Sequence, residues 1–264
     1  MYTKENVLEQ KIEKIREQLR ESVLEREMGV RNIDFAVICN CAIGLLDEIF
    51  GENNYSFPID IHYVYDKMGI PLYEMDLNSY MEGCAPKRVN RIIGKISIRK
   101  DLMTNKMKRS VYIDENTPPV LQRYAMAHEL CHYILQIDES EFYTDEYCNM
   151  PMLPKSPLEL VADAFAIFLL IPLGPFLDEF LNYVKEEKES GRPPFRTSDW
   201  IEHLSAVCFI SKDYVACGYE QIRTVAAWLY EMKGKDVKNC QNVEILMNKR
   251  DIYLREEVIK HLYL

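Results

Sequence analysis

The stretch Ala125–Ile137, AMAHELCHYILQI, contains two histidines four residues apart, with a glutamate directly after the first. On an α-helix, residues four apart lie on one face, about one turn from each other. His128 and His132 can therefore direct ring nitrogens at one metal ion. Glu129 lies about 100° round the helix, beside such an ion, where it can take a proton from a bound water. The pattern H-E-x-x-H thus predicts a zinc site with a general base.

The competing interpretation is an ordinary helix without metal, in which the histidines are a core pair or coincide on a surface. The chain has five histidines, at positions 62, 128, 132, 203 and 261. With so few, a chance H-E-x-x-H has odds on the order of one in a hundred. The sequence therefore favours the metal site and leaves the metal-free helix as the alternative.

A catalytic zinc needs a third protein ligand and one open position. Asp138 is the nearest candidate, but Leu135 stands where a glycine would turn the chain back toward the metal. On a continuous helix Asp138 would lie about 240° away from His132. The stretch Ser156–Pro172, SPLELVADAFAIFLLIP, offers a better candidate in Glu159.

Glu159 and Asp163 are four residues apart and share a helix face. Glu159 can ligate zinc, and Asp163 can accept a hydrogen bond from the far nitrogen of a ligand histidine and fix its tautomer. Asp163 lies among apolar residues, where a carboxylate is costly unless it is paired. In the competing interpretation, Glu159 only completes a capping box with Ser156 at the start of the helix.

The pattern of apolar and turn residues predicts the surrounding elements. Helices are expected at 4–28, at 59–67 with Gly69 as the C-cap, from Pro118 through the opening stretch with Thr117 as the N-cap, at 157–171, and beyond residue 200, including one near 250–262. Strands are expected at 71–75, 91–98 and 109–114, the last two as antiparallel neighbours, and an acidic loop at 138–157. The acidic helix at 4–28 is interpreted as a packed helix with a solvated face, or alternatively as a partner-binding arm.

Composition limits the function classes. The 42 acidic and 32 basic residues give a net charge of −10, which does not favour direct contact with nucleic acid. No apolar run reaches the roughly 20 residues that span a bilayer, and the charged N-terminus has no signal core, so we expect a cytoplasmic protein away from membranes. Most of the eight cysteines are interpreted as small buried apolar residues, and the lone C-x-C of Cys39 and Cys41 does not predict a structural zinc site.

Two motifs together resemble the ImmA/IrrE family of metallo-endopeptidases. RYAMAHELCH and, some thirty residues later, LELVADAFAIFLLIP are similar to the family pattern A-H-E-L-x-H followed by E-x-E-A-N-x-F-A-x-x-L-L-M-P, within a resemblance over about residues 55–222. Three residues depart from the pattern: Cys131 stands for a glycine, Asp163 for an asparagine and Ala125 for a threonine. Cys131 is interpreted as a buried thiol, or alternatively as a redox-sensitive one near the metal.

The resemblance implies an α+β fold: a mostly helical zincin-like domain with a small, largely antiparallel sheet packed on the H-E-x-x-H helix. We expect this domain at 55–188, between an N-terminal helical segment at 1–54 and a helical C-terminal region at 189–264. The resemblance also implies a protein substrate, since several members of this family, encoded on mobile elements and bacterial genomes, cut or otherwise inactivate a transcriptional repressor.

Our hypothesis is a zinc-dependent endopeptidase. One zinc ion is held by His128, His132 and Glu159, Glu129 is the general base, and Asp163 supports a ligand histidine. The substrate is expected to be a regulatory protein such as a helix-turn-helix repressor. The alternative is a metal-bound sensor or repressor-binding module that does not cleave, although a pure binder needs no base at position 129.

Overall fold

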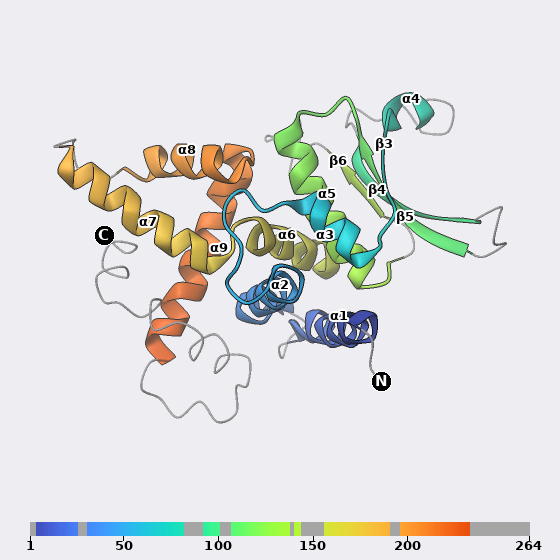
Figure 1. Cartoon of the computed structure of the whole chain (residues 1–264), viewed down its shortest axis with the longest axis horizontal. Coiled ribbons are helices and arrows are strands. Elements are labelled where there is room, and N and C mark those ends of the chain that lie inside the picture. The colour runs from blue at the N-terminus through green and yellow to red at the C-terminus, as the bar shows by residue number, and fades with distance from the viewer. Residues whose placement is uncertain are drawn as a thin grey trace. The chain divides into compact units, whose positions relative to one another are not determined.

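The computed structural model describes residues 4–25, 31–81, 92–100, 107–137, 140–143, 156–190 and 196–232 (Figure 1). The chain divides into two compact units, Met1–Ile33 with Asp60–Ala166, and Asp34–Ile59 with Ile167–Leu264. Each unit joins segments that are distant in the sequence. The domain boundaries predicted after residues 54 and 188 stay predictions, because such units describe packing and not independent folding.

The first unit holds the strands. Its helices are α1 (Lys4–Glu21), α3 (Ile61–Met68), α4 (Leu77–Met81), α5 (Pro119–Ile134) and most of α6 (Pro157–Leu170). Its strands are β1 (Val23–Glu25), β2 (Arg31–Ile33), β3 (Leu72–Met75), β4 (Ile92–Lys100), β5 (Met107–Asp114) and β6 (Ser140–Tyr143). The second unit holds α2 (Phe35–Phe50), α7 (Leu173–Glu189), α8 (Thr197–Cys208) and α9 (Lys212–Met232).

The main sheet has the strand order β3-β5-β4-β6. β3 is parallel to β5, whereas β4 is antiparallel to both β5 and β6. The predicted strands and the antiparallel pairing of β4 with β5 are therefore confirmed. The loop predicted at 138–157 is wrong at Ser140–Tyr143, which pairs with β4 as the edge strand β6. Pairing with an existing strand makes a strand of a segment whose charge alone indicated a loop.

The helix α5 packs on β4 and β5 (Figure 1). Most of its residues from Tyr124 to Ile134 are buried. Its start is tied to the end of β5 by Asp114, whose carboxylate accepts hydrogen bonds from the backbone N–H of Leu77 and the hydroxyl of Thr117. Thr117 is therefore not the N-cap that we predicted. Pro118 takes that position, and the Thr117 hydroxyl satisfies a buried carboxylate instead.

The N-terminal helix is shorter than predicted. α1 ends at Glu21, and Val23–Glu25 instead forms the strand β1, paired with β2, whereas residues 26–28 lie outside the described residues. The Ser22 hydroxyl donates to the carbonyl of Leu19 at the helix end. Ile15 and Leu19 are fully buried, so the interpretation as a packed helix is confirmed for this face of α1.

The second unit is built from helices around an aromatic cluster. Trp200 of α8 is fully buried against Phe176 and Phe180 of α7. The predicted helices after residue 200 are confirmed as far as α9, whereas the one near 250–262 lies outside the described residues. Cys39 and Cys41 are buried in α2, as predicted, and burial raises the pKa of the Cys39 thiol.

Over the part of the chain that the structure describes, no single helix is long and apolar enough to cross a membrane; one bent pair, α6 with α7, passes that test by length and composition only.

Candidate metal centre

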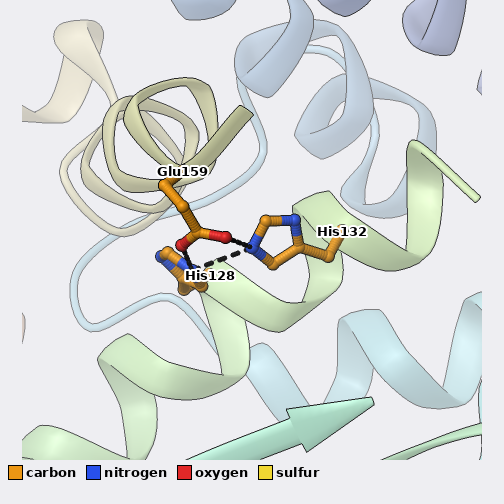
Figure 2. Close-up of side chains that lie close together, drawn as sticks. All are labelled: His128, His132 and Glu159. Carbon is orange, nitrogen blue, oxygen red and sulfur yellow. Dashed lines mark hydrogen bonds and ion pairs between the residues drawn. The ribbon is translucent and has the colours of Figure 1, made fainter. Parts of the chain in front are cut away.

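Three predicted ligands converge on one point (Figure 2). The Nε2 atoms of His128 and His132 lie 3.0 Å apart. The two carboxylate oxygens of Glu159 lie 3.2 Å from the Nε2 atom of His128 and 3.3 Å from that of His132. The proximity of these side chains was predicted from the sequence and is present in the structure. Both histidines are almost fully buried, whereas the Glu159 side chain is 38% exposed, which leaves the centre open on the carboxylate side.

Local structure explains how each ligand reaches the centre. His128 and His132 lie one turn apart on α5, whose apolar residues anchor it to the sheet. Glu159 lies in the first turn of α6, where its backbone N–H donates to the Ser156 hydroxyl. Its carboxylate contacts the histidines and does not return to the N-cap residue. Ser156 therefore caps the helix as predicted, but the interpretation of Glu159 as a mere partner in a capping box is wrong.

The arrangement fits a zinc ion. Zinc bonds of about 2.0–2.1 Å in a tetrahedral arrangement place neighbouring ligand atoms about 3.3 Å apart. The separation of 3.0 Å between the two Nε2 atoms is close to this value. So are the distances of 3.2 and 3.3 Å from these nitrogens, each to a different oxygen of the Glu159 carboxylate. Two imidazole nitrogens with one carboxylate oxygen form the donor set of a catalytic zinc, whereas calcium and magnesium prefer oxygen alone. Among the described residues, this is the one group of His, Cys, Asp and Glu with such a geometry.

The carboxylate of Asp163 lies behind His128. Its Oδ1 atom accepts a hydrogen bond of 3.0 Å from Nδ1 of His128, which leaves the lone pair of Nε2 directed at the centre. The hydroxyl of Tyr124 lies 3.3 Å from the same carboxylate oxygen. Asp163 thus lies where the sequence predicted, on the next turn of α6. Tyr124 was not predicted, although its position four residues before His128 places it on the same face of α5.

The electrostatics of the centre favour a cation. Burial lowers the pKa of His128, but the hydrogen bonds to Asp163 and Glu159 outweigh burial and raise that pKa to about 9. Burial raises the pKa of Glu159, but its contacts with His128 and His132 outweigh burial and hold that pKa far below its usual range. The carboxylates therefore stabilise positive charge at the point where the three ligand atoms meet.

The part of the chain that contains this centre matches a known protein family. The model of the IrrE N-terminal-like domain, peptidase family M78, matches residues 66–198, which include all of α5 and α6. The chain belongs to this family. The comparison with curated proteins gives no match. The match covers just over half of the chain. Because family M78 comprises metallopeptidases, the match places the chain among metal-dependent hydrolases.

In this M78 domain Glu129, the residue after His128 on α5, is fully buried. Its charge contributes to the raised pKa of His128. The pKa of Tyr65, on α3, is raised by burial and then by the charge of Glu129. The Tyr65 hydroxyl donates a 2.8 Å hydrogen bond to the carbonyl of Met126. The charge of Glu129 therefore acts on a ligand histidine, which a general base beside a metal-bound water would also do.

The C-terminal end of α5 is held by arginines that were not predicted. Arg16 and Arg20 of α1 donate to the carbonyls of Ile134 and Leu135, at 2.6 and 3.0 Å. These carbonyls belong to the last turn of the helix, where carbonyl groups have no backbone N–H donors within the helix. Cations there also compensate the helix dipole. α1 precedes the residues matched by the M78 model, so the chain supports α5 with a segment outside that match.

Two other residues singled out in the sequence are Asp138 and Cys131. Asp138, the rejected third ligand, lies outside the described residues. Cys131 is fully buried on α5. Its burial agrees with the interpretation as an enclosed thiol, because a redox-sensitive thiol is expected to be accessible.

Proposed function

We propose that this M78 domain is a zinc-dependent endopeptidase whose metal ligands are His128, His132 and Glu159. The observation that carries the proposal is the convergence of these side chains, from helices separated by a long segment of sequence, to within 4.8 Å of one another. A zinc ion held there would act as a Lewis acid that polarises a peptide carbonyl and lowers the pKa of a bound water.

Each neighbouring residue has a distinct role in this proposal. Glu129 accepts the proton of the attacking water and passes it to the leaving amine. Asp163 keeps the proton on Nδ1 of His128, so that Nε2 presents its lone pair to the metal. The half-exposed carboxylate side of the centre provides the approach for a peptide chain.

We further propose that the substrate is a regulatory protein, such as a helix-turn-helix repressor of a mobile element or stress response, encountered in the cytoplasm. The support is the likeness of the two motifs to those of family members that act in this way. A metal-bound sensor that holds a repressor without cutting it is the alternative. Glu129 weighs against it, because holding a partner requires no general base.

The metal is tested first. Protein purified without affinity tags that bind metal should contain one zinc per chain by mass spectrometry of the element. Replacement of Glu159 by Gln should remove it, because an amide is a far weaker ligand for zinc than a carboxylate. Wild-type protein that neither contains zinc nor binds it at micromolar concentration would contradict the metal centre.

Cleavage is tested with a mixture of peptides derived from a bacterial proteome. Zinc-loaded protein should generate new termini in this mixture, identified by mass spectrometry, whereas the Glu129→Gln variant should retain zinc and lose about 10²–10⁴-fold in rate. Undiminished cleavage by Glu129→Gln would contradict the role of Glu129 as the general base. Absence of cleavage by the wild type, together with binding of intact repressor, would favour the sensor.

A further inference from the structure

The strand β4 approaches the predicted catalytic base, Glu129, at Gly94. This strand is central in the sheet, and Gly94 pairs with Ile113 of β5 on one side and Phe142 of β6 on the other. The register with β6 shifts between Ile92 and Gly94, as at a β-bulge. A glycine inside a strand commonly marks a bulge or a place where another group approaches the backbone.

The space above Gly94 is filled by Glu129. A Cβ atom added at Gly94 would lie 3.1 Å from Cγ of Glu129, 3.3 Å from its Oε1 atom and 3.4 Å from Cβ of Ala125. The first two separations are shorter than ordinary van der Waals contact between such atoms. The side chain of Glu129 therefore runs directly over the Cα atom of Gly94, on the face of β4 that packs against α5.

The need for glycine here is spatial. The glycines with positive φ in the described residues are Gly51 and Gly69. Gly94 has backbone angles that other residues also adopt, and an interior glycine weakens a strand. A larger residue would therefore suit the strand itself. The position of Glu129 is what a larger residue would disturb.

We propose that Gly94 is a positioning residue that seats the carboxylate of Glu129. Its missing side chain lets the carboxylate rest against the backbone of β4, and an added Cβ atom would displace the Glu129 side chain by a few tenths of an ångström. Displacements approaching 1 Å in an active site can reduce a rate about 10²-fold. This inference rests on the proposed role of Glu129 as the general base.

The test is a double-mutant cycle of Gly94→Ala and Glu129→Ala, measured with a fluorogenic peptide made from the sequence cleaved best in the proteome-derived mixture. Gly94→Ala should lower kcat several-fold, up to about 10-fold, with little change in KM, because substrate binding is untouched. Zinc content should stay at that of the wild type, because none of the three ligands is among the nearest neighbours of Gly94. In the Glu129→Ala background the same substitution should cause no further loss.

Gly218→Ala is the matched control, since it also adds a methyl group to a buried glycine. The added Cβ atom would lie 2.6 Å from Cγ2 of Ile167, within the second unit, so it should lower the melting temperature but leave kcat per folded molecule unchanged. An equal loss of kcat in Gly218→Ala, or an additive loss in the double variant, would overturn the proposal. So would a Gly94→Ala variant as active as the wild type.

A crystal structure of Gly94→Ala separates failure of this inference from failure of the proposed function. If the wild type cleaves no peptide, the position of the Glu129 carboxylate still decides the matter. A Glu129 carboxylate displaced from its wild-type position, with the ligand side chains in place, supports the proposed role of Gly94. A carboxylate that remains where it is in the wild type overturns it.

Discussion

The two histidines of the centre are related by one helical turn, yet the protein supports them differently. Nδ1 of His128 donates to Asp163, which is itself within reach of the Tyr124 hydroxyl. Nδ1 of His132 is buried and has no hydrogen-bond partner within the described segments. His132 instead lies in the turn whose carbonyls receive the side chains of Arg16 and Arg20.

The difference shows two ways to orient a ligand. On the His128 side, a carboxylate fixes the ring and its tautomer directly. On the His132 side, the two arginines fix the backbone of the last turn of α5, and the orientation of the His132 ring follows from the geometry of the helix. A direct hydrogen bond acts on one ring, whereas support of the helix end acts through several bonds. We therefore expect larger effects from changes on the His128 side.

The largest expected effect is the loss of a ligand. His128→Ala and His132→Ala should each reduce zinc to less than one tenth per chain after dialysis, because two protein ligands hold zinc weakly. His128→Ala should also lower the melting temperature of the zinc-free protein more than His132→Ala, since it removes the partner of Asp163. Equal melting temperatures would show that Asp163 does not depend on His128. The measurements are elemental analysis and thermal unfolding.

Removal of the supporting carboxylate comes next. Asp163→Ala should weaken zinc binding by about 10- to 100-fold, because the ring of His128 loses its fixed orientation. Competition with a chromogenic chelator measures this affinity. The control is Asp66→Asn, which changes an exposed aspartate of α3 in the same unit. Unchanged zinc affinity in Asp163→Ala would show that Asp163 does not support His128 more strongly than the helix end supports His132.

The stability of the zinc-free protein should depend on pH through His128. Its pKa is raised from 6.5 to about 9 in the folded state. A raised pKa contributes stability that is fully present below 6.5 and is lost as the pH rises through about 9. Urea unfolding of the zinc-free protein should therefore show falling stability between these values. Asp163→Asn should flatten the change, and a zinc-free wild type that gains stability over this range would contradict it.

The smallest effect is expected from the arginines that hold the end of α5. Arg16→Gln with Arg20→Gln should lower the free energy of unfolding by about 1 kcal/mol, because two charged hydrogen bonds to helix carbonyls are lost. Zinc affinity should fall only a few-fold. Lys14→Gln, an exposed change on the same helix, is the control for loss of charge. A loss of zinc affinity as large as that of Asp163→Ala would show that the two sides are supported equally.

The sequence predicted the centre better than its surroundings. Spacing along single helices identified His128, His132, Glu159 and Asp163, because a helix repeats its faces at a known interval. Thr117 and β6 were misjudged, since a buried carboxylate and a neighbouring strand outweighed local preference. Gly94 was passed over, although an isolated glycine in a predicted strand is a recognised sign of close approach.

The sequence by itself determined which chemical groups are present and which of them share a helix face, since both follow from residue type and helical periodicity. Only the tertiary structure decided that α6 brings Glu159 to both histidines, that α1 supports the end of α5, and that β4 presents bare backbone to Glu129. These contacts join segments far apart in the chain. Their geometry depends on how α5 packs against the sheet and the other helices, which local sequence preferences do not encode.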